Sequence, residues 1–434
     1  MNIKKFNIEI HQLLFGLLLS SGFPELINSS VFFQSFDPNL KFQLYAFSLI
    51  VREFFILLIG FKLILILIRK ISSAKISYKL LVGFLPIISL VLLFFYGGSN
   101  FDIVTFIIGI RFYILFSLPL LVLDSSALLN FKKNLTINDF IFYFYLVLSI
   151  LSLVIGYGDF NPKDFGYAAT GNTFLGKRYM FNTANPIIAA QQFGMFLIYA
   201  NFRLFIEKRN SEKTKFMIIS LLLFFLTLFT GGRAGLVVAF TACVSSIIVY
   251  YFPKIKYIFL TQKKIKNKLF ILSTLFLLSI FFFLLSSNKL LSGRMQTQNN
   301  IIRKGLISGV YGNRISILNE YIKENKIEDI IFGTPGLGTN TSCNKIILGK
   351  NCFLTDSLPT TSIISFGIFG ILMYIFILFV VTNISYSPLM TIAFLVFSLS
   401  QIFPELILPW TQFVLLLFHS NQIVKMHKVK NSKR

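Results

Sequence analysis

Apolar stretches long enough to cross a membrane recur along the whole chain, and this pattern leaves few folds open. A helix needs about 20 mostly apolar residues to cross about 30 Å of hydrocarbon. Hydrophobic residues make up 55% of the 434 residues and charged residues only 13%, too little polar surface for a soluble globule of this length. The sequence therefore predicts an all-α polytopic membrane protein with a single domain over residues 1–434.

Twelve helical spans are expected from this pattern. They cover residues 11–32, 44–68, 79–96, 101–123, 140–157, 184–206, 215–230, 233–252, 268–287, 359–382, 389–403 and 406–420. The first span follows Lys4 and Lys5 and lacks a clear cleavage site, so we expect it to be retained and not removed as a signal peptide. The second span carries Arg52, Glu53 and Lys62, which leaves its ends the least defined.

Basic residues favour an orientation with both termini in the cytoplasm, because cytoplasmic loops carry an excess of lysine and arginine. They concentrate in alternate loops, around residues 69–79, 132–133, 203–215 and 254–268, and in both terminal segments. The net charge of +24 is therefore mainly a topology signal and an attraction to anionic membrane lipid. No motif of a nucleic-acid-binding protein accompanies it, so we expect no nucleic-acid partner.

Arg233 lies between two apolar spans, in the turn Thr230-Gly-Gly-Arg-Ala-Gly. A charge near hydrocarbon costs on the order of 3 kcal/mol even on insertion scales. An arginine kept there by a tight Gly-Gly turn indicates an anionic ligand or a counter-charge. The alternative is an interfacial anchor whose guanidinium extends to the lipid headgroups.

The longest loop, residues 288–358, is expected outside the cytoplasm, yet it carries nine basic and five acidic residues. A long loop is exempt from the positive-inside rule, which permits this charge without explaining it. Together with Arg233, the loop predicts an outward-facing cationic cavity at the membrane surface. Guanidinium binds phosphate oxygens in bidentate fashion, so the cavity suits a phosphate or pyrophosphate at headgroup level. The other basic residues expected around this cavity are Lys177, Arg178, Arg294, Arg303, Lys304 and Arg314.

The same loop is expected to contain folded structure. Apolar residues between Ile315 and Ile331 follow a partial helical spacing, which predicts an amphipathic helix lying on the membrane. The glycine-rich segment from Gly333 to Gly338 then ends it. This segment is not a phosphate-binding P-loop, because no Gly-Lys-Ser or Gly-Lys-Thr follows, and a simple turn is the alternative.

Two of the three cysteines, Cys343 and Cys352, lie in this loop. An oxidising compartment would permit a disulfide between them, and two free thiols are the alternative. Their spacing does not fit a zinc site, and no histidine lies near. Cys243 is alone within a span, where we expect it to serve packing.

Few residues on the expected outer face suit acid–base catalysis. His11, His419 and His427 all fall at the inner side, which argues against a serine–histidine hydrolase. Asp356, just before the tenth span, could face the cationic cavity, or it could cap the helix that begins near Pro359. The weaker candidates are Asp159, Asp164 and Glu320.

Four short pieces of sequence occur in order between about residues 170 and 375. They are Gly176-Lys177-Arg178 with Asn185-Pro186 at the start of a span, the turn at residues 230–235, Arg314 with Gly336 and Gly338, and Asp356-Ser357 before a span with Gly367 and Gly370. In their order and their placement around one large outer loop, these pieces resemble the bacterial O-antigen polymerase and ligase family, the Wzy-type polymerases in particular.

The resemblance implies a fold of the C-type membrane glycosyltransferase (GT-C) kind in the bacterial cytoplasmic membrane. It implies as substrate an oligosaccharide linked to undecaprenyl pyrophosphate, moved as a block onto the next lipid-linked repeat. Asp356 would be the general base on the acceptor hydroxyl, with inversion at the anomeric carbon. Arginines would neutralise the departing pyrophosphate without a metal or cofactor, and a chain-length regulator is a possible partner. These arginines are Arg178, Arg233, Arg303 and Arg314, and Lys177, Asn185 and Arg294 are further expected binding residues.

Arg111, inside the fourth span, could reach the same cavity. It could instead pair with Asp102 or Asp124, which would make it structural. The segment Thr355-Asp356-Ser357 lacks the histidine that O-antigen ligases resembling this chain carry near the last loop motif, so polymerase is favoured over ligase.

Two other classes stay open. A transporter or flippase for a lipid-linked or anionic solute would share the span number and the cationic cavity. Against it stand the single folded loop late in the chain and the lack of an obvious repeat between halves. A structural subunit of a glycan-export complex would keep its activity in Arg233→Ala and Asp356→Asn variants.

Overall fold

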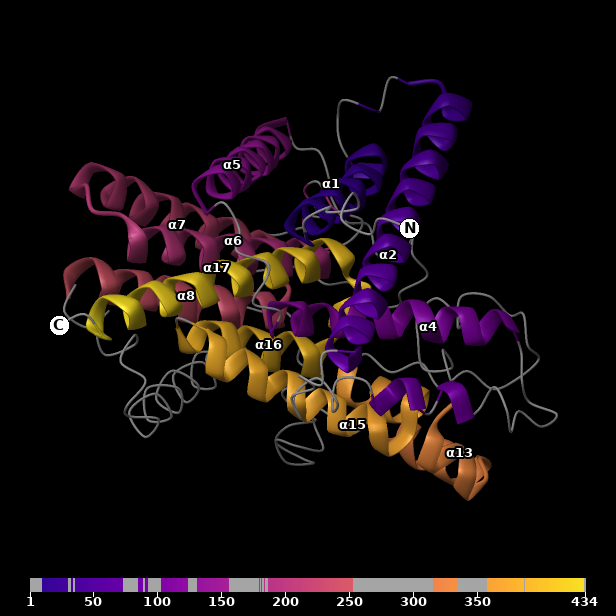
Figure 1. Cartoon of the computed structure of the whole chain (residues 1–434). Helices are drawn as coiled ribbons and strands as arrows, with labels where there is room; N and C mark the ends of the chain where they lie inside the picture. Colours follow the sequence, from indigo (N-terminus) through magenta and orange to yellow (C-terminus); the bar gives the residue numbers. More distant parts are fainter. Residues whose placement is uncertain are drawn as a thin grey trace, which may run out of the picture.

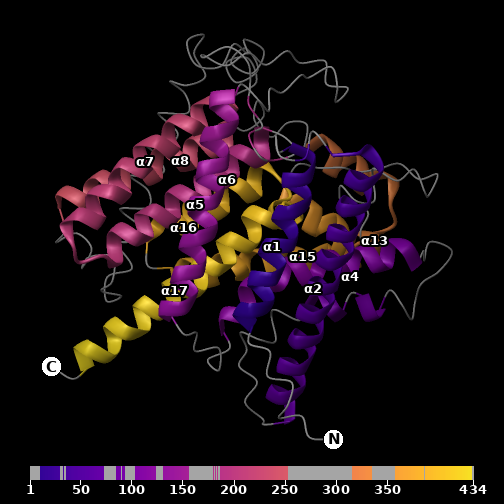
Figure 2. The same ribbon diagram turned by 90° about the horizontal axis from the view of Figure 1, so that it is seen from above.

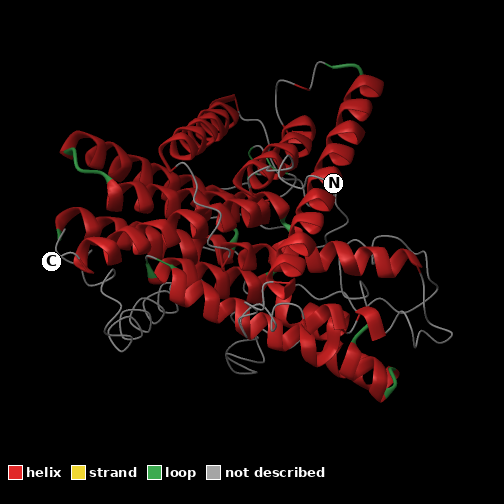
Figure 3. Ribbon diagram, in the orientation of Figure 1, coloured by secondary structure: helices red, strands yellow, loops and turns green. Residues whose placement is uncertain are grey.

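The computed structural model of the chain is helical, and the residues that it describes include no β-sheet (Figure 3). These residues are 10–29, 33, 36–72, 85–88, 90–92, 103–123, 131–155, 179, 181, 183, 186–252, 315–334, 357–385 and 387–432. A helix satisfies its backbone N–H and C=O groups within the segment, which is what a hydrocarbon environment demands. The described part is therefore consistent with a helical membrane protein.

The N-terminal third forms three long helices and one shorter one. They are α1 (Ile10–Ser29), α2 (Pro38–Ser72), α4 (Ile103–Ser117) with the 3-10 turn η3 (Leu118–Leu123), and α5 (Phe131–Ile155). α1 packs along α2, where Gly16 leaves room for the ring of Phe55. Gly60 of α2 similarly receives Ile114 of α4. α2 thus links α1 to α4.

One face of α2 carries large apolar side chains that are exposed. From Phe47 they recur every three to four residues, at Phe47, Ile50, Phe54, Leu57, Phe61, Ile64 and Ile68, and Leu40 lies two turns earlier. Such a continuous apolar stripe is the face a helix would turn to lipid. α2 extends beyond the expected span 44–68 at both ends.

The middle of the chain forms three closely packed helices, α6 (Pro186–Ile206), α7 (Asn210–Thr230) and α8 (Arg233–Tyr251). α6 is buried along nearly its whole length and packs against both α7 and α8. A helix that is apolar on all sides is expected at the centre of a bundle. Figures 1 and 2 show α7 and α8 on one side of the molecule and α2, α4 and α13 on the other.

Besides a helix over residues 315–324, the described C-terminal part contains one short helix and three longer ones. They are α13 (Ile327–Phe332), α15 (Leu358–Ile384), α16 (Pro388–Ser400) with η5 (Phe403–Glu405), and α17 (Ile407–Ser432). α13 lies beside α15, and α16 packs against both α15 and α8. The indole of Trp410 in α17 stacks on Phe413 and donates a 2.8 Å hydrogen bond to the Leu115 carbonyl. This bond ties α17 to α4.

Three helices in the described part are long and apolar enough to cross a membrane: Asn210–Thr230, Ala234–Tyr251 and Leu358–Ile384. Shorter apolar helices occupy Gln12–Ile27, Phe106–Val122, Asn138–Ser152 and Pro388–Ser400. The expected span 268–287 lies outside the described residues, as does most of 79–96. The number of twelve spans, the inner and outer sides and the GT-C architecture therefore remain predictions.

The helix predicted over residues 315–331 is wrong in one respect, because the structure has two helices there. The first covers residues 315–324 and is followed by a bend at Asn325, whose side-chain amide nitrogen donates a 2.8 Å hydrogen bond to the Tyr321 carbonyl. The second is α13, and it ends at Gly333, as the glycine-rich segment predicts. Tyr321 is the buried anchor, whereas Ile315, Ile322, Ile327 and Ile331 are exposed.

Candidate functional site

The Arg233 turn, residues 230–235, is formed as the sequence predicts. α7 ends at Thr230, and Gly231 adopts the left-handed conformation (φ 61°) that glycine accepts without strain. The Thr230 hydroxyl accepts a 3.2 Å hydrogen bond from the Gly232 N–H. α8 then begins at Arg233 with no side chain capping it, so its first N–H groups have no partner within the helix. The structure describes the backbone of Arg233 and not its side chain.

The Arg233 turn packs against the first turn of α6. A Cβ on Gly232 or on Gly235 would lie 2.4 Å from the Cβ of Ala190, and one on Gly232 would lie 3.4 Å from the Pro186 carbonyl. Both glycines are therefore required by close approach of the two helices. The starts of α6 and α8 consequently lie side by side, and the positive ends of two helix dipoles meet there.

A third piece of sequence joins this junction through Tyr179. Its N–H donates a 3.1 Å hydrogen bond to the Phe229 carbonyl, and its ring lies edge-on to the Phe229 ring at 5.8 Å. Tyr179 directly follows Arg178, and Pro186 directly follows Asn185. The backbone therefore brings together the first two of the four pieces that resembled the polymerase family, although they lie about 50 residues apart in sequence.

The last of the four pieces, with Gly367 in α15, receives the segment 315–334. Gly367 interrupts the helix with φ 59°, and a Cβ there would lie 2.0 Å from the Ile331 carbonyl oxygen. The Thr334 N–H donates a 2.7 Å hydrogen bond to the Ile364 carbonyl. The segment that follows Arg314 is thus fixed on the first half of α15, the helix that follows Asp356. The N-cap of α15 is Ser357 and not Asp356.

Most of the expected site residues lie outside the described part of the chain. They are Lys177, Arg178, Asn185, Arg294, Arg303, Arg314, Cys343, Cys352 and Asp356. The structure therefore fixes the neighbours of several of them and leaves their own roles as predictions. Cys243 is described, and it is a free, buried cysteine in α8, as the sequence predicts.

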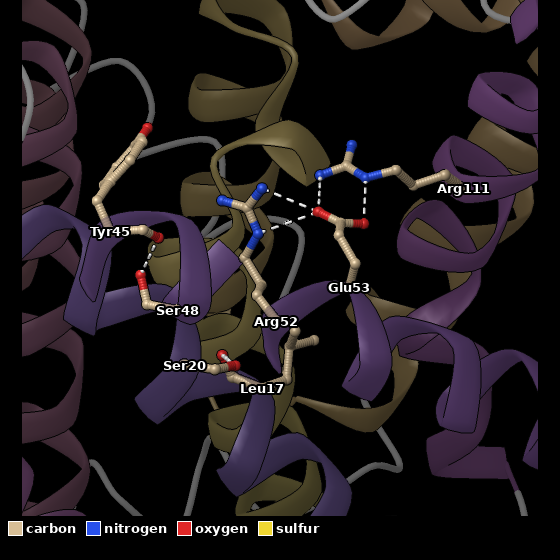
Figure 4. Close-up of polar contacts among 7 residues, drawn as sticks. All are labelled: Leu17, Ser20, Tyr45, Ser48, Arg52, Glu53 and Arg111. Carbon is tan, nitrogen blue, oxygen red and sulfur yellow. Dashed lines mark hydrogen bonds and ion pairs between the residues drawn. The ribbon is translucent and has the colours of Figure 1, made fainter. Parts of the chain in front are cut away.

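Arg111 is the one expected binding residue whose side chain is described, and its partner is Glu53 of α2. Its guanidinium donates two hydrogen bonds to the carboxylate, at 2.8 and 3.1 Å (Figure 4). Arg52 approaches the same carboxylate from another side, at 2.9 and 3.2 Å. Asp102 and Asp124, the partners considered from the sequence, lie outside the described residues.

The Arg52–Glu53–Arg111 cluster combines two positive charges with one negative charge and is partly accessible. The exposed fractions of its side chains are 22%, 38% and 19% in that order. Arg111 lies eight residues inside α4 from Ile103, which is about 12 Å along the helix. The cluster is therefore nearer the middle of a span than the headgroup level at which we expected a pyrophosphate.

A second charged cluster was missed by sequence reasoning. Arg203 of α6, 8% exposed, donates hydrogen bonds to Asp139 of α5 and, at 2.5 Å, to Glu207 one turn away. Tyr199 donates a 2.8 Å bond to the same Asp139. Only the Arg203–Glu207 spacing was visible in the sequence, as a pair four residues apart. This cluster lies at the end of α6 opposite the Arg233 turn, and we read it as a structural link between α5 and α6.

No group of three histidine, cysteine, aspartate or glutamate side chains that could hold a metal ion occurs among the described residues. Comparisons with protein-family models, with curated proteins and with solved structures found no match to this chain. Function therefore has to be argued from the residues and their arrangement.

Proposed function

We propose that this chain is a membrane glycosyltransferase that polymerises lipid-linked oligosaccharide repeat units. The observation that supports the proposal most is the junction of the Arg233 turn with the start of α6 and with Tyr179. Four pieces of sequence resembled the O-antigen polymerases, and two of them meet at this junction. A chance resemblance in separate loops would give no reason for them to meet.

The chemistry of the junction suits a pyrophosphate. Two helices begin there, and the first N–H groups of a helix have no partner within it, a recurrent arrangement for binding phosphate. Arg233 is the first residue of α8, and Arg178 directly precedes Tyr179 in the sequence, so we expect both guanidinium groups near this junction. Such fixed positive charge would stabilise the negative charge that develops on a departing pyrophosphate.

In the proposed reaction, a hydroxyl of the acceptor repeat attacks the anomeric carbon of the first sugar of the growing glycan. The new bond forms from the hydroxyl oxygen to that carbon, and the bond from the carbon to the pyrophosphate oxygen breaks. Asp356 takes the hydroxyl proton as general base, and undecaprenyl pyrophosphate leaves with the electron pair. Direct displacement inverts the configuration. The product is O-antigen or another surface polysaccharide.

The test is complementation of a polymerase-null strain with Arg233→Ala, Arg314→Ala and Asp356→Asn, read as the length of the glycan ladder at equal protein level. Loss of a general base costs about a hundredfold or more in rate, so short or absent ladders are expected. Arg209→Ala is the matched control, because Arg209 is exposed at the other end of α7, about 31 Å from the Arg233 turn. Full ladders from all three variants would remove the proposed site.

A transporter of a lipid-linked anionic solute is the second candidate, and the Arg52–Glu53–Arg111 cluster is the observation that favours it. Ionisable groups in the middle of a span commonly mark a substrate or ion pathway. The two functions differ in where single lipid-linked repeats accumulate in a null strain. Loss of a polymerase leaves them on the outer leaflet, and loss of a flippase leaves them on the inner leaflet.

A further inference from the structure

A small cavity lies beneath the segment that joins Tyr179 to α6. Its walls come from α5, from Phe181 and Thr183, and from α6, and half of the lining side chains are aromatic. The residues that matter here are Tyr145, Phe181, Thr183, Gln192, Phe193 and Phe196. The cavity therefore lies between Phe181 and the first half of α6, the helix whose first turn packs against the Arg233 turn.

Gln192 lines this cavity and has a polar atom that makes no hydrogen bond within the described part of the chain. The side chain is 3% exposed, and its amide nitrogen donates a 2.8 Å hydrogen bond to the side-chain oxygen of Gln412 in α17. Its own oxygen, Oε1, has no hydrogen-bond partner among the described residues. A buried acceptor left without a donor is destabilising, so such an atom needs an explanation.

Phe181 covers the cavity in a strained conformation. Its φ of 52° lies in the left-handed region, which a bulky residue seldom adopts. The ring is buried and lies edge-on to Phe193 at 4.9 Å. Strain of this kind is often held at ligand sites, where movement of the strained residue relieves it. Displacement of the Phe181 ring would open the cavity toward Gln192.

We propose that this cavity binds a neutral sugar hydroxyl of the glycan substrate, with Gln192 Oε1 as the acceptor. The inference rests on the proposed function and adds a specificity-determining residue to it. A hydroxyl can donate to an amide oxygen, whereas an ionised phosphate oxygen cannot, so the cavity is chemically distinct from a pyrophosphate site. The aromatic rings around it offer apolar surface to the C–H groups of a sugar.

The experiment compares Gln192→Met with Gln412→Met in proteoliposomes. The substrate is the lipid-linked repeat unit purified from cells that lack the chain, and the initial rate is measured against its concentration. Both variants lose the bond between the two glutamines, but only Gln192→Met removes the acceptor from the cavity. We expect KM to rise about tenfold in Gln192→Met with kcat little changed, and to stay within about twofold of wild type in Gln412→Met.

Equal increases in KM for both variants would mean that the glutamine pair only joins α6 to α17, and a wild-type KM in both would mean that the cavity holds only water. Either result overturns the inference. If Gln192→Met does not fold, Gln192→Asn, which withdraws the amide by one methylene, is compared with Gln412→Met in the same way. An inactive wild-type protein would instead refute the proposed function.

Discussion

The guanidinium of Arg111 and the carboxylate of Glu53, 58 residues apart in sequence, are joined by two hydrogen bonds between α4 and α2. Arg52 shares the same carboxylate. Because one carboxylate binds two guanidinium groups, its removal should lower the stability of the fold more than removal of either arginine.

Glu53→Gln should lower the free energy of unfolding by about 1–3 kcal/mol, between the values for exposed and buried ion pairs. The substitution leaves two guanidinium groups without a counter-charge. Unfolding in detergent can be followed by the fluorescence of Trp410, the only tryptophan of the chain. Glu212→Gln is the control, because Glu212 is an exposed carboxylate 3.9 Å from Lys215 and should cost less than about 0.5 kcal/mol. Similar losses in both variants would contradict the assignment.

The stability lost in a Gly232→Ala variant should be restored by a second substitution in α6. Gly232→Ala places a Cβ 2.4 Å from that of Ala190 and should cost about 1–3 kcal/mol. Ala190→Gly removes that atom, and the next contacts, at 3.4 and 3.5 Å, are ordinary. Gly235→Ala should not be rescued, because the backbone of Ala190 remains 2.5 Å away. The measurement is the melting temperature of the single and double variants. If Ala190→Gly restored the stability of the Gly232→Ala and Gly235→Ala variants equally, the described packing would be contradicted.

Gly367→Ala should release the segment 315–334 from α15. The new Cβ would meet the Ile331 carbonyl oxygen at 2.0 Å, and φ 59° is unfavourable for alanine. We expect a loss of about 1–3 kcal/mol and faster cleavage of the segment in limited proteolysis. Ile368→Ala is the neighbouring control, since Ile368 is 53% exposed. Equal cleavage rates in the two variants would show that Gly367 does not hold the segment.

Tyr321 should make the stability of this segment depend on pH in the alkaline range. Its hydroxyl donates a 2.9 Å hydrogen bond to the Asp329 carbonyl, and burial raises its pKa to about 12. The neutral form is thus favoured by folding, so the contribution is complete below the unfolded pKa of about 10 and is lost as pH rises toward 12. Tyr321→Phe should cost about 1 kcal/mol at neutral pH and less above pH 10. A difference in melting temperature that is the same at pH 8 and pH 11.5 would contradict this.

Several features were predictable because they depend on neighbours in the sequence. The turn at Gly231 and the helix end at Gly333 follow from the freedom of glycine at positive φ, and both are confirmed. The break at Asn325 was not predicted, because the apolar spacing continues past it to Ile331. The burial of Tyr321, with the isoleucines exposed, depends on packing against α15, so the sequence did not predict it either.

The amino-acid sequence alone determined that the chain is helical and apolar and that a turn places Arg233 at the start of a helix, because composition, periodicity and glycine act over a few residues. Only the tertiary structure decided which charges meet. Glu53 pairs with Arg111 because α2 packs on α4, and Asp139 pairs with Arg203 because side chains of α5 contact α6. The approach of Gly232 to Ala190 was decided in the same way. Such contacts join residues tens of positions apart, and local sequence carries no record of which helix faces which.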